Sequence, residues 1–312
     1  MPSLAARLMK RLFRARIRRD GLDQAQLVAH LRQVFNHTPV PTLLPRDVRV
    51  TQLQCADFSG EKVTVASPEV TILYLHGGAY MAGVTRTYHN LAGRLAKRLR
   101  AEVFLPTYPL APEHPFPHAC ERVLEAYRFL LREGRKPESI IIAGDSAGGG
   151  LTLATLLAIK DNDLPRPAGA VTFSPGTRAH EPGASAQAND ATDCMLSADM
   201  IRQAVNIYVP DPGQRHHPYA SPCLGDYTGM PPVMITVASD ECLYDDARSV
   251  RDALEASGVE VTWIERTGLF HVWPVMVPFL PEAQQELKNI EHFIRRCTGK
   301  LTARSAALEF SR

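Results

Sequence analysis

The chain has 312 residues, of which 45% are hydrophobic and 22% are charged, and its formal net charge at pH 7 is +2. These proportions are typical of a globular protein, and the small net charge gives no reason to expect nucleic-acid binding. No apolar stretch approaches the roughly 18 residues that a membrane-spanning helix needs, so we expect no stable membrane insertion.

The N-terminal segment, residues 1–19, is strongly basic and contains no acidic residue. It lacks the apolar core and the cleavage site of a secretory signal peptide. An apolar stripe accompanies the basic residues and consists of Leu4, Leu8, Leu12 and Ile17. This pattern predicts an amphipathic helix docked on the protein with its charged face in solvent. The alternatives are a helix that lies on an anionic membrane surface and a transit peptide.

After this segment, short apolar runs alternate with helical patterns. We predict strands at residues 48–53, 62–65, 70–75, 102–106, 139–143, 169–173, 233–238 and 259–264. We predict helices at residues 89–99, 118–132, 149–160, 245–257 and 282–296. Such alternation predicts an α/β fold with a largely parallel sheet, helices on both faces, and a site at the carboxyl ends of the strands.

Two segments do not fit the alternation, residues 1–45 and about 176–231. Neither contains a strand long enough to join the sheet. We therefore divide the chain into an N-terminal cap segment, 1–45, and a catalytic domain, 46–312, with a cap insertion at about 176–231. Both cap segments are expected to lie above the strand ends.

The six cysteines are scattered, without the close spacing to cysteine or histidine that a zinc site needs. They are Cys55, Cys120, Cys194, Cys223, Cys242 and Cys297. We expect free thiols in a reducing compartment, a cytoplasmic protein and no bound metal. The sequence leaves the oligomeric state open, and a homodimer is one alternative.

The most informative motif is Gly-Asp-Ser-Ala-Gly at residues 144–148. It lies between a predicted strand and a predicted helix, the context in which G-x-S-x-G forms a sharp turn that exposes the serine hydroxyl. Ser146 is therefore the candidate nucleophile. The alternative is that this serine merely caps the helix in a glycine-rich turn.

A second glycine-rich turn, His76-Gly77-Gly78, follows an earlier strand. The backbone N–H groups of Gly77 and Gly78, with that of Ala147 after the serine, are candidate donors of an oxyanion hole. The alternative is an ordinary Gly-Gly turn after a strand.

An acid and a base are expected at the ends of later strands. Asp240 and Glu241 are the candidate acids, because Asp245 and Asp246 are expected to begin the following helix, where the dipole favours negative charge. His271 follows the last predicted strand and is the candidate base. The alternative for a histidine beside Phe and Trp is a packed side chain.

These motifs together resemble the hormone-sensitive-lipase-like branch of the α/β-hydrolases, which includes bacterial esterases and acetyl-hydrolases. The matching segments are residues 76–79, 108, 110–117, 144–149, 216–222 and 271–273. The resemblance spans roughly residues 45–297. It implies the α/β-hydrolase fold, with a mostly parallel eight-stranded sheet, helices on both faces and a helical cap.

Carried over residue by residue, the resemblance implies Ser146 as nucleophile, His271 as base, and an oxyanion hole from Gly77, Gly78 and Ala147. The acid of the family lies in an Asp-x-Leu-x-Asp pattern. Alignment on the leucine places Glu241 at the position of that acid, and we favour it over Asp240.

The resemblance also implies a carboxylic ester hydrolase for short acyl chains, with a small-molecule ester as substrate and no metal or organic cofactor. A dedicated acetyl-hydrolase or lactonase is the nearest alternative. A membrane-surface lipase that uses the basic N-terminus is another. A non-catalytic ligand-binding homologue, as the plant gibberellin receptors resemble this family, is expected to lack the base, whereas His271 is present in its motif.

Overall fold

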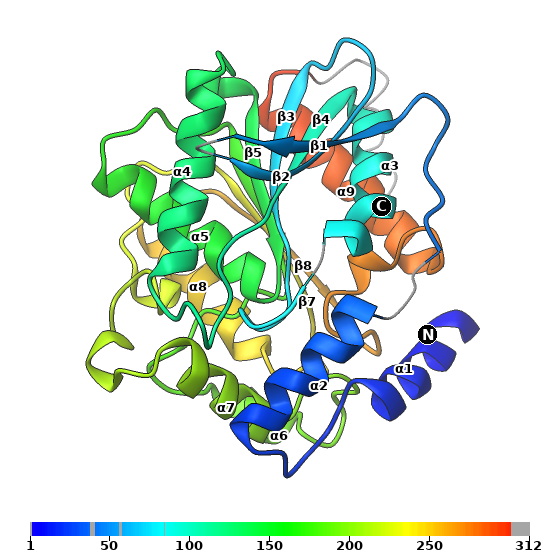
Figure 1. The fold of residues 1–312 in the computed structure, drawn as a ribbon, viewed down its shortest axis with the longest axis vertical. Coiled ribbons are helices and arrows are strands. Elements are labelled where there is room, and N and C mark those ends of the chain that lie inside the picture. Colours follow the sequence, from blue (N-terminus) through cyan, green and yellow to red (C-terminus); the bar gives the residue numbers. More distant parts are fainter. Residues whose placement is uncertain (1, 38–40, 56–57, 84, 301–312) are drawn as a thin grey trace.

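An eight-stranded sheet forms the centre of the computed structural model, which describes residues 2–37, 41–55, 58–83 and 85–300 (Figure 1). The strands are β1 (Arg49–Gln54), β2 (Ser59–Thr64), β3 (Val70–Leu75), β4 (Ala101–Pro106), β5 (Ile140–Asp145), β6 (Gly169–Phe173), β7 (Val233–Ala238) and β8 (Val261–Arg266). All eight predicted strands are confirmed, with bounds that shift by a few residues.

The spatial order of the strands is β1-β2-β4-β3-β5-β6-β7-β8. β2 is antiparallel to both β1 and β4, and every other neighbouring pair is parallel. The five strands from β3 to β7 are buried at every position. Helices cover both faces of a parallel sheet, which is why these strands are continuous apolar runs in the sequence.

The α-helices include the five that were predicted and four in the two segments outside the alternation. They are α1 (Leu4–Arg16), α2 (Gln24–His37), α3 (His89–Leu99), α4 (His118–Arg132), α5 (Ala147–Asp161), α6 (Ala184–Ala188), α7 (Ala198–Tyr208), α8 (Tyr244–Ala256) and α9 (Pro281–Cys297). Short 3-10 helices are η1 (Thr85–Tyr88), η2 (Pro137–Ser139), η3 (Pro212–Gln214), η4 (Pro222–Leu224) and η5 (Trp273–Met276).

Two hydrophobic cores lie on opposite faces of the sheet. Alternate residues of β3 divide between them: Leu73 and Leu75 join the core that includes α4, α5 and α8, whereas Ile72 and Tyr74 join the core that includes α3 and α9. This alternation follows from the two-residue period of a strand. The predicted arrangement of helices on both faces is confirmed.

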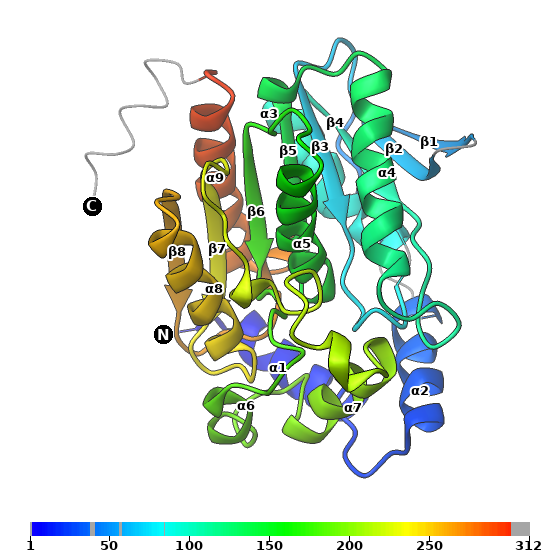
Figure 2. The same ribbon diagram turned by 90° about the vertical axis from the view of Figure 1, so that its left-hand side faces the viewer.

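The helices α1, α2, α6 and α7 gather at the end of the sheet where β6 ends (Figure 2). The two chain segments that supply them are tied together. The Arg18 guanidinium bonds the carboxylate of Asp190 and donates to the carbonyl oxygens of Asp193 and Leu196, each at 3.0 Å. This helical layer positions side chains over the carboxyl ends of the strands.

Helix α1 docks on the protein as predicted, but not through its leucines. Ala6 and Ile17 are buried, and the ring of Phe13 meets that of Phe270 edge to face with centroids 5.2 Å apart. The other predicted members of the apolar stripe are exposed to solvent, by 65% at Leu4, 55% at Leu8 and 48% at Leu12. The leucine row therefore faces outward.

Candidate active site

Ser146 lies on a sharp turn between β5 and α5, with φ 53° and ψ −120°. Non-glycine residues rarely adopt a positive φ, so the surrounding chain must impose it. The flanking glycines allow this turn. A Cβ at Gly144 would lie 2.3 Å from the carbonyl oxygen of Gly148, and a Cβ at Gly148 would lie 2.0 Å from that of Leu75.

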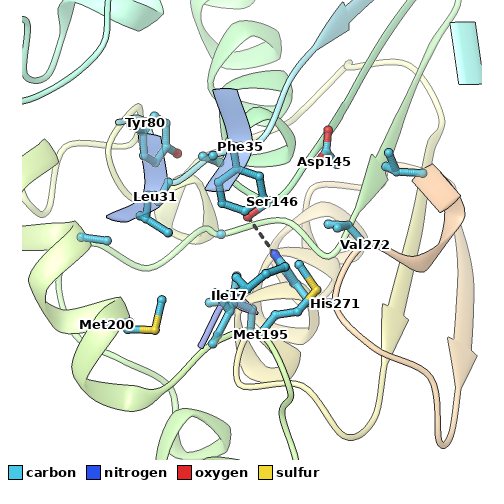
Figure 3. A pocket seen from close by; sticks show the side chains of 18 of the residues that line it. Ile17, Leu31, Phe35, Tyr80, Asp145, Ser146, Met195, Met200, His271 and Val272 are labelled. Carbon is cyan, nitrogen blue, oxygen red and sulfur yellow. Dashed lines mark hydrogen bonds between the residues drawn. The ribbon is translucent and has the colours of Figure 1, made fainter. Parts of the chain in front are cut away.

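His271 lies beside this serine. Its Nε2 is 2.9 Å from Ser146 Oγ, as the dashed line in Figure 3 marks. The histidine sits in the loop between β8 and η5 and is only 3% exposed. The next residue, Val272, has a left-handed backbone and donates its N–H to Ser174 Oγ at 3.1 Å, which fixes the loop.

The structure brings Glu241, not Asp240, to the imidazole. Glu241 Oε2 is 2.6 Å from His271 Nδ1, and Oε1 accepts the N–H of Ala238 at 2.9 Å. The carboxylate of Asp240 instead lies 3.6 Å from Lys10 Nζ on α1. Ser146, His271 and Glu241 thus form one continuous hydrogen-bonded chain, with the last two members buried.

Burial and charge have opposite effects on the pKa values of His271 and Glu241. Burial lowers the pKa of His271, but the hydrogen bond and the negative charge of Glu241 outweigh it, so the pKa is raised above its usual value. Burial raises the pKa of the Glu241 carboxyl, while the hydrogen bond to His271 opposes that rise. A carboxylate at this position fixes the imidazole and stabilises its protonated form.

The glycine-rich turn after β3 contains the candidate N–H donors of the oxyanion hole, and the structure shows which of these N–H groups are free. The N–H of Gly77 is already donated, at 2.9 Å to Tyr88 Oη and at 3.1 Å to Asp145 Oδ1. Across the described residues, the N–H groups of Gly78, Ala79 and Ala147 have no acceptor. The expected role of Gly77 as a donor therefore does not fit this geometry, whereas the free N–H of Ala79, the next residue after Gly78, was not among the predicted donors.

The backbone conformation at Gly78 is accessible only to glycine. Its φ is +124°, and a Cβ would lie 1.9 Å from the carbonyl oxygen of Ala82. Ala79 and Tyr80 follow with φ of 55° and 61°. Consecutive residues with such dihedrals turn their N–H groups toward one side, an arrangement that suits a negatively charged oxygen.

Asp145, which lies directly before the nucleophile in the serine motif, holds this turn in place through hydrogen bonds. Its buried carboxylate accepts hydrogen bonds from Tyr74 at 3.0 Å, Tyr88 at 3.1 Å and the N–H of Gly77. Burial raises its pKa to about 6, and these hydrogen bonds oppose the rise. His76 also packs beneath the turn: its Nδ1 lies 2.8 Å from the carbonyl oxygen of Gly77, and its ring stacks on that of Tyr108 at 4.2 Å. Burial lowers the pKa of His76 to about 4.

Asp245 and Asp246 lie in the first turn of α8, as predicted, but Asp246 has a further role. One carboxylate oxygen accepts the N–H groups of Thr177 and Arg178, at 2.8 and 3.0 Å. Burial raises the pKa of Asp246 to about 7. This carboxyl fastens the segment after β6 to α8, and nothing in the sequence motif indicated that contact.

A cavity of about 290 Å³ opens over Ser146. The helical layer supplies much of its wall, including Ile17, Leu31, Phe35, Met195 and Met200, which surround the serine and the histidine in Figure 3. The rings of Tyr80 and Tyr208 stack in parallel at 3.6 Å and close one side. The lining is mostly apolar, so the cavity suits an uncharged, apolar ligand.

Comparison with known proteins agrees with this geometry. A family profile described as α/β hydrolase fold matches residues 72–275. The chain belongs to this family. An acetyl-hydrolase of Streptomyces hygroscopicus is 38% identical over 284 residues, which are 91% of this chain and 90% of the relative.

Solved structures place the chain in the hormone-sensitive-lipase-like branch. The crystal structure of EstE5 soaked with p-nitrophenyl butyrate gives a TM-score of 0.85 at 32% identity, covering 95% of this hydrolase and 99% of EstE5. An esterase from the bacterial hormone-sensitive lipase family gives 0.85 at 29% identity, covering 96% and 99%. The chain is therefore an enzyme, a serine carboxylesterase of the α/β-hydrolase fold.

Proposed function

We propose that this esterase hydrolyses carboxylic esters of short acyl chains through an acyl-enzyme intermediate on Ser146. The observation that carries the proposal is the chain of hydrogen bonds from Ser146 Oγ through His271 to Glu241, at 2.9 and 2.6 Å. Each member stands at the end of a different strand–loop unit, so the arrangement depends on the whole fold.

In the first half of the reaction, Ser146 Oγ attacks the ester carbonyl carbon while His271 Nε2 takes the hydroxyl proton. The carbonyl oxygen becomes an oxyanion. His271, now protonated and stabilised by Glu241, gives its proton to the departing alcohol. In the second half, water attacks the acyl carbon while His271 takes a proton from it. His271 then returns that proton to Ser146 Oγ as the bond to the serine breaks and the carboxylic acid departs.

The oxyanion is held by the N–H groups of Gly78, Ala79 and Ala147. They have no acceptor within the described residues, and Ala147 begins α5, whose N-terminus favours negative charge. Donors that are fixed before the reaction stabilise the transition state without reorganising, and one such hydrogen bond is worth roughly 3–4 kcal/mol in other hydrolases.

The acyl-chain preference of the enzyme depends on the two cap segments. Residues 1–45 and about 176–231 form the cap, and residues 46–312 the catalytic domain. Several described residues of these cap segments line the cavity over Ser146, among them Leu31, Phe35 and Met200. These side chains bound the cavity of about 290 Å³ on the cap side, so the cap shapes the space that the acyl and alcohol groups of the ester would occupy.

An acetyl-hydrolase is the nearest second candidate, because the Streptomyces relative at 38% identity carries that name. A panel of p-nitrophenyl esters distinguishes the two. For a general short-chain esterase, kcat/KM is highest for butyrate or hexanoate and falls for decanoate and palmitate. A maximum at acetate with a steep fall at butyrate favours the acetyl-hydrolase, and a maximum at palmitate contradicts both.

The nucleophile is tested with Ser146→Ala. We expect cleavage of p-nitrophenyl butyrate to fall to the background rate. Ser139→Ala is the matched control, because this serine lies just before β5, at the opposite end of the strand from the nucleophile. Full turnover by Ser146→Ala, with wild-type folding by circular dichroism, would refute the proposal.

Location and assembly remain predictions. All six cysteines are free thiols in the structure, which supports a reducing compartment such as the cytoplasm. Across the described residues, no helix combines the length and the hydrophobicity of a membrane span. A homodimer stays an open alternative to a monomer.

A further inference from the structure

The outward face of α1 carries an unusual row of apolar side chains. Leu4, Leu8 and Leu12 follow one another at intervals of four residues, so they lie along one side of the helix. All three are about half exposed or more. The only other large hydrophobic side chains exposed to this degree in the described chain are Leu43 and Leu224. Among the described residues, this row is thus where such side chains follow one another along a helix.

Basic residues border the leucine row. Arg7 and Arg11 lie beside it and Arg16 continues it, given the 3.6-residue period of the helix. These three arginines are exposed and have no side-chain partner among the described residues. Lys10, by contrast, turns toward the protein and bonds the carbonyl oxygen of Gly268.

The helix is firmly held, so the exposure of its leucines is not that of a frayed end. Ser3 caps α1 by accepting the N–H of Ala6 at 3.1 Å, and its own N–H is donated to Glu282 at 2.6 Å. Phe13 packs on Phe270 from the buried side. The fold therefore presents the leucine row in a fixed orientation.

The leucine row leads to the cavity. Leu12, the last leucine of the row, also lines the cavity over Ser146, together with Arg16 and Ile17. An apolar path thus runs along α1 from the surface to the mouth of the active site. A ligand that leaves a lipid phase at this face would enter the cavity without crossing an expanse of polar surface.

We propose that the outward face of α1 docks on an anionic lipid surface. The leucines insert between the acyl chains while Arg7, Arg11 and Arg16 meet the anionic headgroups, as in helices that lie in the membrane interface. A second copy of the chain is a poorer partner, because the two basic faces would repel each other. Resting on the proposed function, the further consequence is that esters dissolved in that surface reach Ser146 through the mouth at Leu12.

The docking is tested as binding of the full chain to lipid vesicles, with no further ester added. One set is phosphatidylcholine alone, and the other contains phosphatidylglycerol as a third of the lipid. We expect co-sedimentation with the anionic vesicles and at least about tenfold weaker binding to the neutral ones. Raised salt is expected to weaken the binding, because the arginine contribution is screened.

Two variants locate the docking face. Leu4→Ser with Leu8→Ser is expected to weaken binding to the anionic vesicles at least about tenfold, because two apolar side chains no longer insert. Neither leucine lines the cavity, so cleavage of soluble p-nitrophenyl butyrate should be unchanged and reports correct folding. Leu224→Ser, at a similarly exposed leucine on another face, is the matched control and should bind like the wild type.

Equal binding by the double variant and by Leu224→Ser would overturn the proposal, as would failure of the wild type to bind anionic vesicles. Self-association that the double variant abolishes, seen by analytical ultracentrifugation, would show that a second copy covers this face instead. Ser146→Ala separates docking from catalysis: it should bind vesicles like the wild type, so a failure of the proposed function leaves the docking result intact.

Discussion

Replacement of Glu241 by glutamine is expected to reduce kcat by up to about 10⁴-fold, close to 5 kcal/mol of barrier. The structure fixes how the amide would sit. Oε1 accepts the N–H of Ala238 at 2.9 Å, so the amide oxygen stays there and the NH₂ group faces His271 Nδ1. Nδ1 must then accept, which leaves the imidazole proton on Nε2, where it cannot take the proton of Ser146.

The same substitution is expected to shift the pH profile. The base must be neutral, so kcat/KM rises with pH through the pKa of His271. Burial lowers that pKa, whereas Glu241 raises it above its usual value. Loss of the carboxylate removes the rise, so the acid limb of the residual activity should move to lower pH.

The assay is the pH dependence of kcat/KM for p-nitrophenyl butyrate, with Asp240→Asn as the matched control. Asp240 lies near Lys10 on α1 and not at the imidazole, so this variant should keep activity within a few fold. A large loss in Asp240→Asn with near-normal Glu241→Gln would refute the reasoning and restore Asp240 as the acid.

Three further predictions concern the turns and buried carboxyls around the site. Gly148→Ala should lose activity and about 1–3 kcal/mol of stability, measured by urea unfolding, because its Cβ would lie 2.0 Å from the β3 backbone. Asp246→Asn should gain thermal stability relative to the wild type between pH 5 and pH 8. Burial raises the pKa of the native Asp246 carboxyl from the ordinary 3.8 to about 7. The wild type therefore loses on the order of 3 kcal/mol of stability as the pH rises from 5 to that pKa, and a constant difference in melting temperature would contradict this. A crystal structure with a phosphonate bound to the serine should show the phosphonyl oxygen within hydrogen-bond distance of the N–H groups of Gly78 and Ala79, and contact with Gly77 instead would contradict the assignment.

Much of the fold could be predicted from the sequence because its strands are buried on both faces. Continuous apolar runs at β3 and β5, with glycine-rich turns after each, have few alternative interpretations. The strand–turn–helix context of Ser146 likewise predicted the sharp turn that the structure contains. Such features are local, so a single segment of sequence encodes them.

Features that depend on distant partners were less accessible. Gly77 could not be recognised as structural, because its N–H is occupied by Tyr88 and Asp145 from other parts of the chain. Within the predicted apolar stripe of α1 and its C-cap, Ile17 is buried, whereas the three leucines face solvent. Ala6 and Phe13 pack on the protein instead, and helical spacing alone did not indicate that contact. The choice of Glu241 rested on an alignment with the family pattern, and only the fold supplies its distance to His271.

Identification of the covalent intermediate decides whether Ser146 is the nucleophile. The esterase is quenched with acid during turnover of p-nitrophenyl butyrate, digested and analysed by mass spectrometry. We expect one butyryl group on the peptide that contains Ser146, and no such label in Ser146→Ala. A butyryl group on another residue, or full turnover by Ser146→Ala, would contradict it.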